Sequence, residues 1–279
     1  MKKLSSISLL HYCKLLVRGS VFLAMLVIYI RGRILGNTDP FGFLEEIGLI
    51  HFVIFGVFAV EVTLRFFPSR VESMGCQKQF AHNYIPTVAN DGGRHRLGTW
   101  RSTLAVLLAW IGLNGAIAAL YYTDVIDVGI LVLVSLFYSV SDMICILFFC
   151  PFQTWFMKNK CCGSCRIYNW DYAMMFTPLA FVPHPLARAL FLMGVLLLIV
   201  WEVAVLLHPE RFDVETNAAL RCANCSEKLC HHKKQLRAFL RRHNERFRVK
   251  ENIALLAERL QARLPKRKDK NKKDNGEKS

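Results

Sequence analysis

Two pairs of cysteines in this chain have the spacing of metal ligands. Cys162 and Cys165 form one C-x-x-C pair, and Cys222 and Cys225 form another about sixty residues later. In this spacing a tight turn presents two thiolates to one ion, and four thiolates hold Zn²⁺ tetrahedrally. The sequence therefore predicts a structural or sensory zinc site that both pairs share.

Further donors stand beside these pairs, namely Cys161, Cys230, His231 and His232. Other uses of the cysteines stay open, including unpaired thiols. Disulfides would form if the loops faced an oxidising compartment, and an iron–sulfur cluster also takes four cysteines, although the ferredoxin spacing is absent. A redox pair at Cys162 and Cys165 would make the chain a membrane thiol oxidoreductase, but the βαβ context of such pairs is missing.

The composition indicates an integral membrane protein. The chain has 279 residues, of which 53% are hydrophobic, and the apolar residues come in long blocks rather than in periodic stripes. Blocks of this length suit a bilayer core that is about 30 Å thick. We expect an all-α, polytopic helical membrane protein rather than a soluble one.

Six transmembrane helices are predicted within residues 1–208. Their ranges are about 13–30, 47–67, 102–122, 128–149, 167–183 and 186–207. The first is interpreted as a retained helix, because no small-residue cleavage site follows it. The fifth carries Asn169, Asp171 and Pro178, so whether it crosses or re-enters stays open.

The distribution of charge favours an even number of crossings. Lys and Arg collect on cytoplasmic loops, and six crossings place the N-terminus, loops 68–101 and 151–166 and the basic tail on one side. Arg31 and Arg33, on the opposite side, count against this topology. We expect a plasma membrane protein with both termini in the cytoplasm.

Residues 209–264 are predicted to form a cytosolic, Cys-containing, basic helical tail, and residues 265–279 a disordered Lys-rich end. Lys and Arg are twice as numerous as Asp and Glu from residue 209 onward, which favours contact with anionic lipid headgroups. A short apolar seam at 249–260 allows homo-oligomerisation through the tail helix, or packing on lipid or on the protein's own base. No nucleic-acid-binding motif accompanies the charge.

Three carboxylates, Glu61, Asp142 and Glu202, fall inside predicted spans, where an ionisable group needs a partner or a role. With six crossings all three lie roughly 8–11 Å below the cytoplasmic boundary, so they could bind a cation or relay protons. A simpler interpretation pairs Glu61 with Arg65 and lets Glu202 snorkel. Asp142 has no basic residue within four positions and is the leading functional candidate.

Lys14 and Arg18, in the first span, are expected to snorkel toward the headgroups. The motifs of nucleotide-binding, zinc-protease and serine-hydrolase sites are absent, so no catalytic residue is assigned and an enzyme is not favoured. The leading hypothesis is a non-enzymatic membrane protein with a zinc site. The alternatives are a cation- or proton-coupled transporter that uses the three carboxylates, and the thiol oxidoreductase.

Overall fold

The computed structural model describes residues 6–35, 48–68, 77–87, 99–159, 161 and 164–224. The helices in these ranges are α1 (Ser6–Ile34), α3 (Gly48–Leu64), α5 (Trp100–Tyr122), α6 (Val128–Leu147), α7 (Asp171–Phe176) and α8 (Pro185–Leu207). No strand forms in this part of the chain, where the extended pairing is one isolated bridge between Pro86 and Asn217. The prediction of an all-α fold is confirmed.

Among the described residues, four helices are long and apolar enough to cross a membrane: α1, α5, α6 and α8. At 1.5 Å per residue, the 20 residues of α6 reach roughly 30 Å, which matches a bilayer core. α3 is also apolar but shorter. The prediction of a helical membrane protein is therefore supported, whereas six transmembrane helices are not confirmed.

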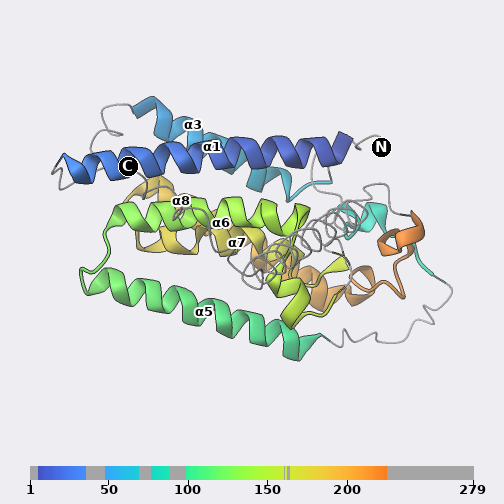
Figure 1. Ribbon diagram of the computed structural model, residues 1–279. Coiled ribbons are helices and arrows are strands. Elements are labelled where there is room, and N and C mark those ends of the chain that lie inside the picture. The colour runs from blue at the N-terminus through green and yellow to red at the C-terminus, as the bar shows by residue number, and fades with distance from the viewer. Residues whose placement is uncertain are drawn as a thin grey trace, which may run out of the picture. The chain divides into compact units, whose positions relative to one another are not determined.

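α1 and α6 run antiparallel, and side-chain contacts fix their directions (Figure 1). Arg18 of α1 bonds Asp142 near the end of α6, whereas Tyr29 of α1 bonds Asp127 just before the start of α6. α5 and α6 are joined by a short link and also run antiparallel. We call the end of the bundle where α1 and α5 begin, and where α3, α6 and α8 end, the basal end.

Local sequence explains where α6 and α8 start. The Asp127 side chain accepts a hydrogen bond from the Ile130 backbone N–H at 2.9 Å, which caps the first turn of α6. α8 begins at Pro185, whose fixed φ suits the first helical position and whose missing N–H would be unbonded there in any case.

The region predicted as a fifth transmembrane helix, 167–183, is a broken helix. α7 has six residues and is flanked by 3₁₀ turns at Tyr168–Trp170 and Thr177–Phe181. Pro178 lacks an N–H, so the α-helical bonding of α7 cannot continue through it. With the steeper rise of the 3₁₀ turns, the three pieces together reach roughly 25 Å, although α7 alone is far too short to cross.

This broken segment crosses the bundle antiparallel to α3 and α8. The ring of Phe176 meets that of Phe58 of α3, while Tyr172 bonds Glu61 one turn further along α3. Farther toward the basal end, Trp170 bonds Glu202, near the end of α8. The segment therefore carries the chain from the end of α6 to the start of α8.

The broken segment also forms much of the core. Tyr172, Met175 and Phe176 are each at most 2% exposed, and they pack with Leu131 of α6 and Leu197 of α8. Most of the exposed surface of α1, α5 and α8 is apolar. Helices with apolar residues both inside and outside are typical of a membrane bundle.

The segments that follow α3 and α8 are joined at the basal end. The side chain of Asn217 is fully buried, its amide donates to the carbonyls of Lys78 and Arg211, and its oxygen accepts from the backbone of Ala219. Thr87 bonds the Thr216 carbonyl beside it. A buried Asn in this position ties 77–87 to 209–221 because it satisfies backbone groups of both.

Gly194 allows α8 to approach α7 closely. A Cβ placed on Gly194 would lie 3.0 Å from the carbonyl oxygen of Tyr172 and 3.2 Å from the backbone nitrogen of Ala173. These are backbone atoms, which cannot rotate away as a flexible side chain could.

We expect Gly194→Ala to lower the free energy of unfolding by about 1–3 kcal/mol, because the added methyl group overpacks the interface between α7 and α8. The measurement is thermal unfolding of the detergent-purified protein. Gly115→Ala in α5 is the matched control, since a Cβ there meets nothing within 4 Å. Equal melting temperatures for the two variants would contradict the close approach.

Candidate functional site

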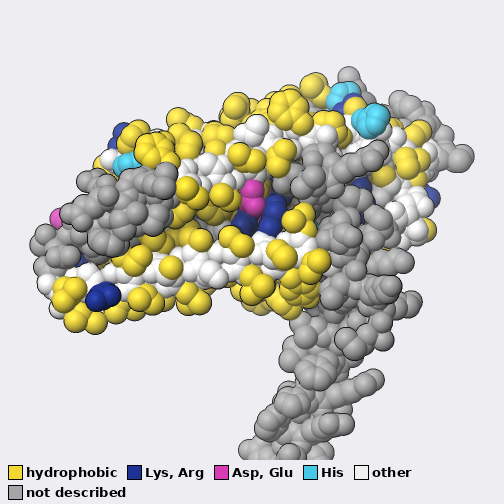
Figure 2. All heavy atoms as spheres, turned by 90° about the horizontal axis from the view of Figure 1, so that it is seen from above, with side chains coloured by type: hydrophobic (Ala, Val, Ile, Leu, Met, Phe, Trp, Pro, Cys, Tyr) yellow, Lys and Arg dark blue, Asp and Glu magenta, His cyan; other side chains and the backbone are white. Residues whose placement is uncertain are grey.

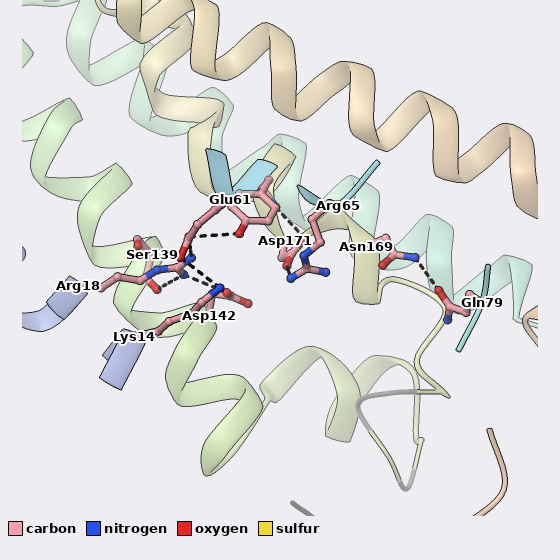
Figure 3. A network of polar contacts seen from close by, with 10 residues as sticks. Lys14, Arg18, Glu61, Arg65, Gln79, Ser139, Asp142, Asn169 and Asp171 are labelled. Carbon is pink, nitrogen blue, oxygen red and sulfur yellow. Dashed lines mark hydrogen bonds and ion pairs between the residues drawn. The ribbon is translucent and has the colours of Figure 1, made fainter. Parts of the chain in front are cut away.

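A cluster of charged side chains lies inside the bundle, with the guanidinium of Arg18 at its centre. Nη2 of Arg18 donates to Oε2 of Glu61 at 2.5 Å, and Nη1 donates to Oδ2 of Asp142 at 3.3 Å and to the Ser139 carbonyl at 3.2 Å. The Arg18 side chain is only 6% exposed. One cation from α1 thus bridges carboxylates of α3 and α6 (Figure 3).

Glu61 receives two further donors. Nζ of Lys14 lies 3.2 Å from Oε1 of Glu61, and the Tyr172 hydroxyl donates to Oε2 at 3.2 Å. Lys14 stands one turn before Arg18 on α1, so both basic side chains face α3. Glu61 is therefore well compensated by α1 and α7 together.

A second buried ion pair lies beside this cluster. Arg65, in the turn directly after α3, donates to Asp171 at 2.7 Å, and both side chains are less than a tenth exposed. The guanidinium of Arg65 also lies 5.6 Å from the ring centre of Tyr168 and 5.2 Å from that of Tyr172. Such contacts with aromatic faces stabilise a desolvated cation.

We call six residues the charge cluster: Lys14, Arg18, Glu61, Arg65, Asp142 and Asp171. Three are basic and three are acidic, so the cluster is neutral when all are ionised. Neutrality matters because an unpaired charge in the hydrocarbon region costs at least about 2.5 kcal/mol.

Polar atoms of the charge cluster reach the surface within an apolar face. Figure 2 shows basic and acidic side chains in a depression that hydrophobic side chains surround. Within the cluster, the side chains of Lys14, Asp142 and Glu61 are 20%, 16% and 15% exposed. The charge cluster is thus largely buried, but part of it is exposed at the surface of the bundle.

Glu202 stands apart from the other two predicted carboxylates. Arg166 donates to it with both guanidinium nitrogens, at 2.7 Å and 2.5 Å, and Nε1 of Trp170 donates to Oε1 at 2.7 Å. The structure thus brings Glu61 and Asp142 together through Arg18, whereas Glu202 belongs to a pair of its own near the basal end.

Three expected arrangements are wrong. Glu61 does not pair with Arg65 one turn away, because Arg65 bonds Asp171 and Glu61 bonds Arg18. Lys14 and Arg18 do not snorkel toward the headgroups, because carboxylates inside the bundle attract them. Glu202 is not simply exposed to headgroups either, since Arg166 binds it.

Sequence reasoning missed the partners Arg18, Asp171 and Tyr172. One signal was present in the sequence, since Lys14 and Arg18 share one face of an otherwise apolar helix. Which carboxylate meets that face depends on tertiary packing, and a single sequence does not contain that information.

The predicted metal site falls partly outside the described residues. Cys162, Cys225, Cys230, His231 and His232 are not among them. Of the rest, Cys165 is buried, Cys161 is half-buried and Cys222 is exposed. Within the described ranges, no group of three or more His, Cys, Asp or Glu residues could hold a metal ion.

The described members of the two cysteine groups, Cys161, Cys165 and Cys222, nevertheless lie at the basal end. Cys161 and Cys165 lie between α6, which ends there, and Arg166, which binds Glu202 near the end of α8. Cys222 follows α8 by a short stretch that Asn217 ties to 77–87. Cys165 packs there with Met157 and Trp170.

No protein-family model, curated protein or solved structure matches this chain.

We expect Arg18→Gln to destabilise the protein by about 3–5 kcal/mol, because it leaves two carboxylates in the bundle without their shared cation. Thermal unfolding in detergent measures the effect. The matched control is Arg33→Gln on the same helix, because the Arg33 side chain is 51% exposed where it pairs with Asp127. An exposed pair contributes at most about 1 kcal/mol. A loss in Arg33→Gln as large as that in Arg18→Gln would contradict this assignment.

Proposed function

We propose that the chain is a non-enzymatic integral membrane protein with six crossings and a zinc-binding base at the cytoplasmic face. The broken segment serves as the fifth crossing. Its antiparallel course beside α3 and α8 and its reach of roughly 25 Å support this topology. α3 serves as the second crossing.

The basic loops favour a cytoplasmic basal end in the plasma membrane. On the opposite side, Arg33 is paired with Asp127 and lies against the ring of Tyr29. Basic residues on the far side count against six crossings. Because Arg33 is paired there, its charge counts less against this topology. The tail beyond residue 224, proposed to contact anionic lipid and to allow homo-oligomerisation, lies outside the described residues.

One observation carries the zinc proposal, namely that both cysteine groups follow elements that end at the basal end. Two C-x-x-C pairs on one face can share one ion, whereas pairs on opposite faces cannot. The site would hold 150–166 and the segment after α8 together. A structural metal site of this kind stabilises the fold because binding is coupled to folding.

We expect the purified protein to contain about one zinc per chain, with Cys162→Ser and Cys222→Ser each losing it. Elemental mass spectrometry of the detergent-purified protein gives the metal content. Cys13→Ser is the control, because Cys13 is an exposed residue of α1 outside both groups. Iron instead of zinc, or full zinc in both variants, would overturn the proposal.

A second candidate is a proton- or cation-coupled transporter, and the charge cluster favours it. Ionisable side chains within transmembrane segments often mark ion pathways or proton relays. Here the cluster joins α1, α3, α6 and α7, and the side chains of Lys14, Asp142 and Glu61 keep partial exposure. The thiol oxidoreductase gains no support from the described residues, and its Cys162 lies outside them.

For a transporter, Asp142→Asn should abolish ion-dependent uptake in proteoliposomes, because the amide cannot exchange a proton or bind a cation by charge. Glu202→Gln is the control, since Glu202 pairs with Arg166 away from the charge cluster, and it should retain most of the uptake. Uptake by Asp142→Asn at the rate of the unmodified protein would remove this candidate.

A further inference from the structure

The carboxylates of the charge cluster are compensated unequally. Glu61 accepts contacts from Lys14, Arg18 and Tyr172, of which the Arg18 contact is 2.5 Å long. The hydrogen bond described for Asp142 is a single one, from Arg18 at 3.3 Å. Charge-assisted bonds between a basic nitrogen and a carboxylate are normally about 2.7–2.9 Å. Of the carboxylates in the charge cluster, Asp142 therefore makes the weakest described contact with a basic side chain.

An unsatisfied hydroxyl, that of Ser139, lies one helical turn before Asp142 on α6. Oγ of Ser139 is buried and has no hydrogen-bond partner among the described residues, and the Ser139 side chain is only 1% exposed. Ser139 precedes Asp142 by three positions, so both lie on one face of α6. Arg18 Nη1 contacts the Ser139 carbonyl and Asp142 together, which fixes this face toward α1 (Figure 3).

We propose that Asp142 is a proton-binding site and that the Ser139 hydroxyl, which has no partner in the described arrangement, turns to bond Asp142 in either protonation state. A hydroxyl can donate to an ionised carboxylate and accept from a protonated one. When Asp142 takes up a proton, Arg18 loses its weaker contact and keeps its short contact with Glu61. The charge cluster then changes from neutral to a net charge of +1.

The same geometry disfavours a metal cation at Asp142. From α1, Lys14 and Arg18 face this region, and the pair of Arg65, directly after α3, with Asp171 of α7 lies beside it. Both cations raise the net charge of the charge cluster, but among the described residues no group of three or more His, Cys, Asp or Glu residues could hold a metal ion, whereas a proton needs a single carboxylate oxygen. The proton is therefore the ligand that the site accommodates best.

The other titratable groups around Asp142 either have hydrogen-bond partners of their own or are not carboxyl groups. Glu61 and Tyr172 bond each other, and Asp171 holds Arg65 at 2.7 Å. His11 lies buried on α1, one turn before Lys14 and on the same face. An imidazole gives no carboxylic acid signal, so a carboxyl-specific measurement separates His11 from Asp142.

This inference rests on the proposed transport function for its biological purpose. The proton site itself is tested by an experiment that does not measure transport. The experiment is infrared difference spectroscopy of the purified protein in lipid nanodiscs during a pH titration. We expect a band from a buried protonated carboxyl that is lost in Asp142→Asn, retained in Glu202→Gln and shifted in frequency in Ser139→Ala. Glu61→Gln should retain the band as well.

A second measurement guards against misfolding of Asp142→Asn. The unmodified protein is labelled with ¹³C at the side-chain carboxyl of aspartate, which shifts the band only if an aspartate carries the proton. The inference is overturned if no such band titrates, if it survives in Asp142→Asn, or if glutamate labelling shifts it instead. A titrating Asp142 without liposome uptake would keep the proton site and remove only the transport candidate.

Discussion

The arrangement of the bundle depends on one buried cation. Arg18 lies on α1, yet its two terminal nitrogens reach carboxylates of α3 and α6, so three helices must pack in one register to satisfy it. A guanidinium suits this position because it presents several donors in a rigid plane. In a membrane, apolar side chains do not drive helices together as they do in water. Directional polar contacts such as these consequently decide which helices are neighbours.

The broken segment is the second constraint, and it depends on the first. Tyr172 of α7 joins the charge cluster through Glu61, and Asp171 binds Arg65, the residue directly after α3. Gly194 lets α8 lie directly on the backbone of the same segment. Exposed backbone groups at a helix break are costly in lipid, so such a break is tolerated where protein surrounds it. The burial of Tyr172 and Phe176 meets that requirement.

Sequence alone predicted much of the fold because the signals are local. The long apolar blocks located α5, α6 and α8 to within about two residues, and a boundary of this kind needs only composition and a helix breaker such as Pro185. The break in 167–183 was signalled by Pro178, but the packing that makes it tolerable was not.

The charge cluster was predicted only in part. Glu61 and Asp142 stood out as ionisable residues in apolar spans, whereas their shared partner, Arg18, lies 43 and 124 positions away from them. Local spacing suggested Arg65 as the partner of Glu61, but in the structure Glu61 pairs with the distant Arg18.

The central claim is that Arg18 and Glu61 act as one interacting pair inside the bundle. A double-mutant cycle with Arg18→Gln, Glu61→Gln and the combined variant measures it most directly, with unfolding in detergent as the readout. The predicted result is a coupling free energy of about 1–3 kcal/mol, so that the combined variant is more stable than the two single losses would give. Single effects that add to within about 0.5 kcal/mol would contradict the claim, because residues that do not touch behave in that way.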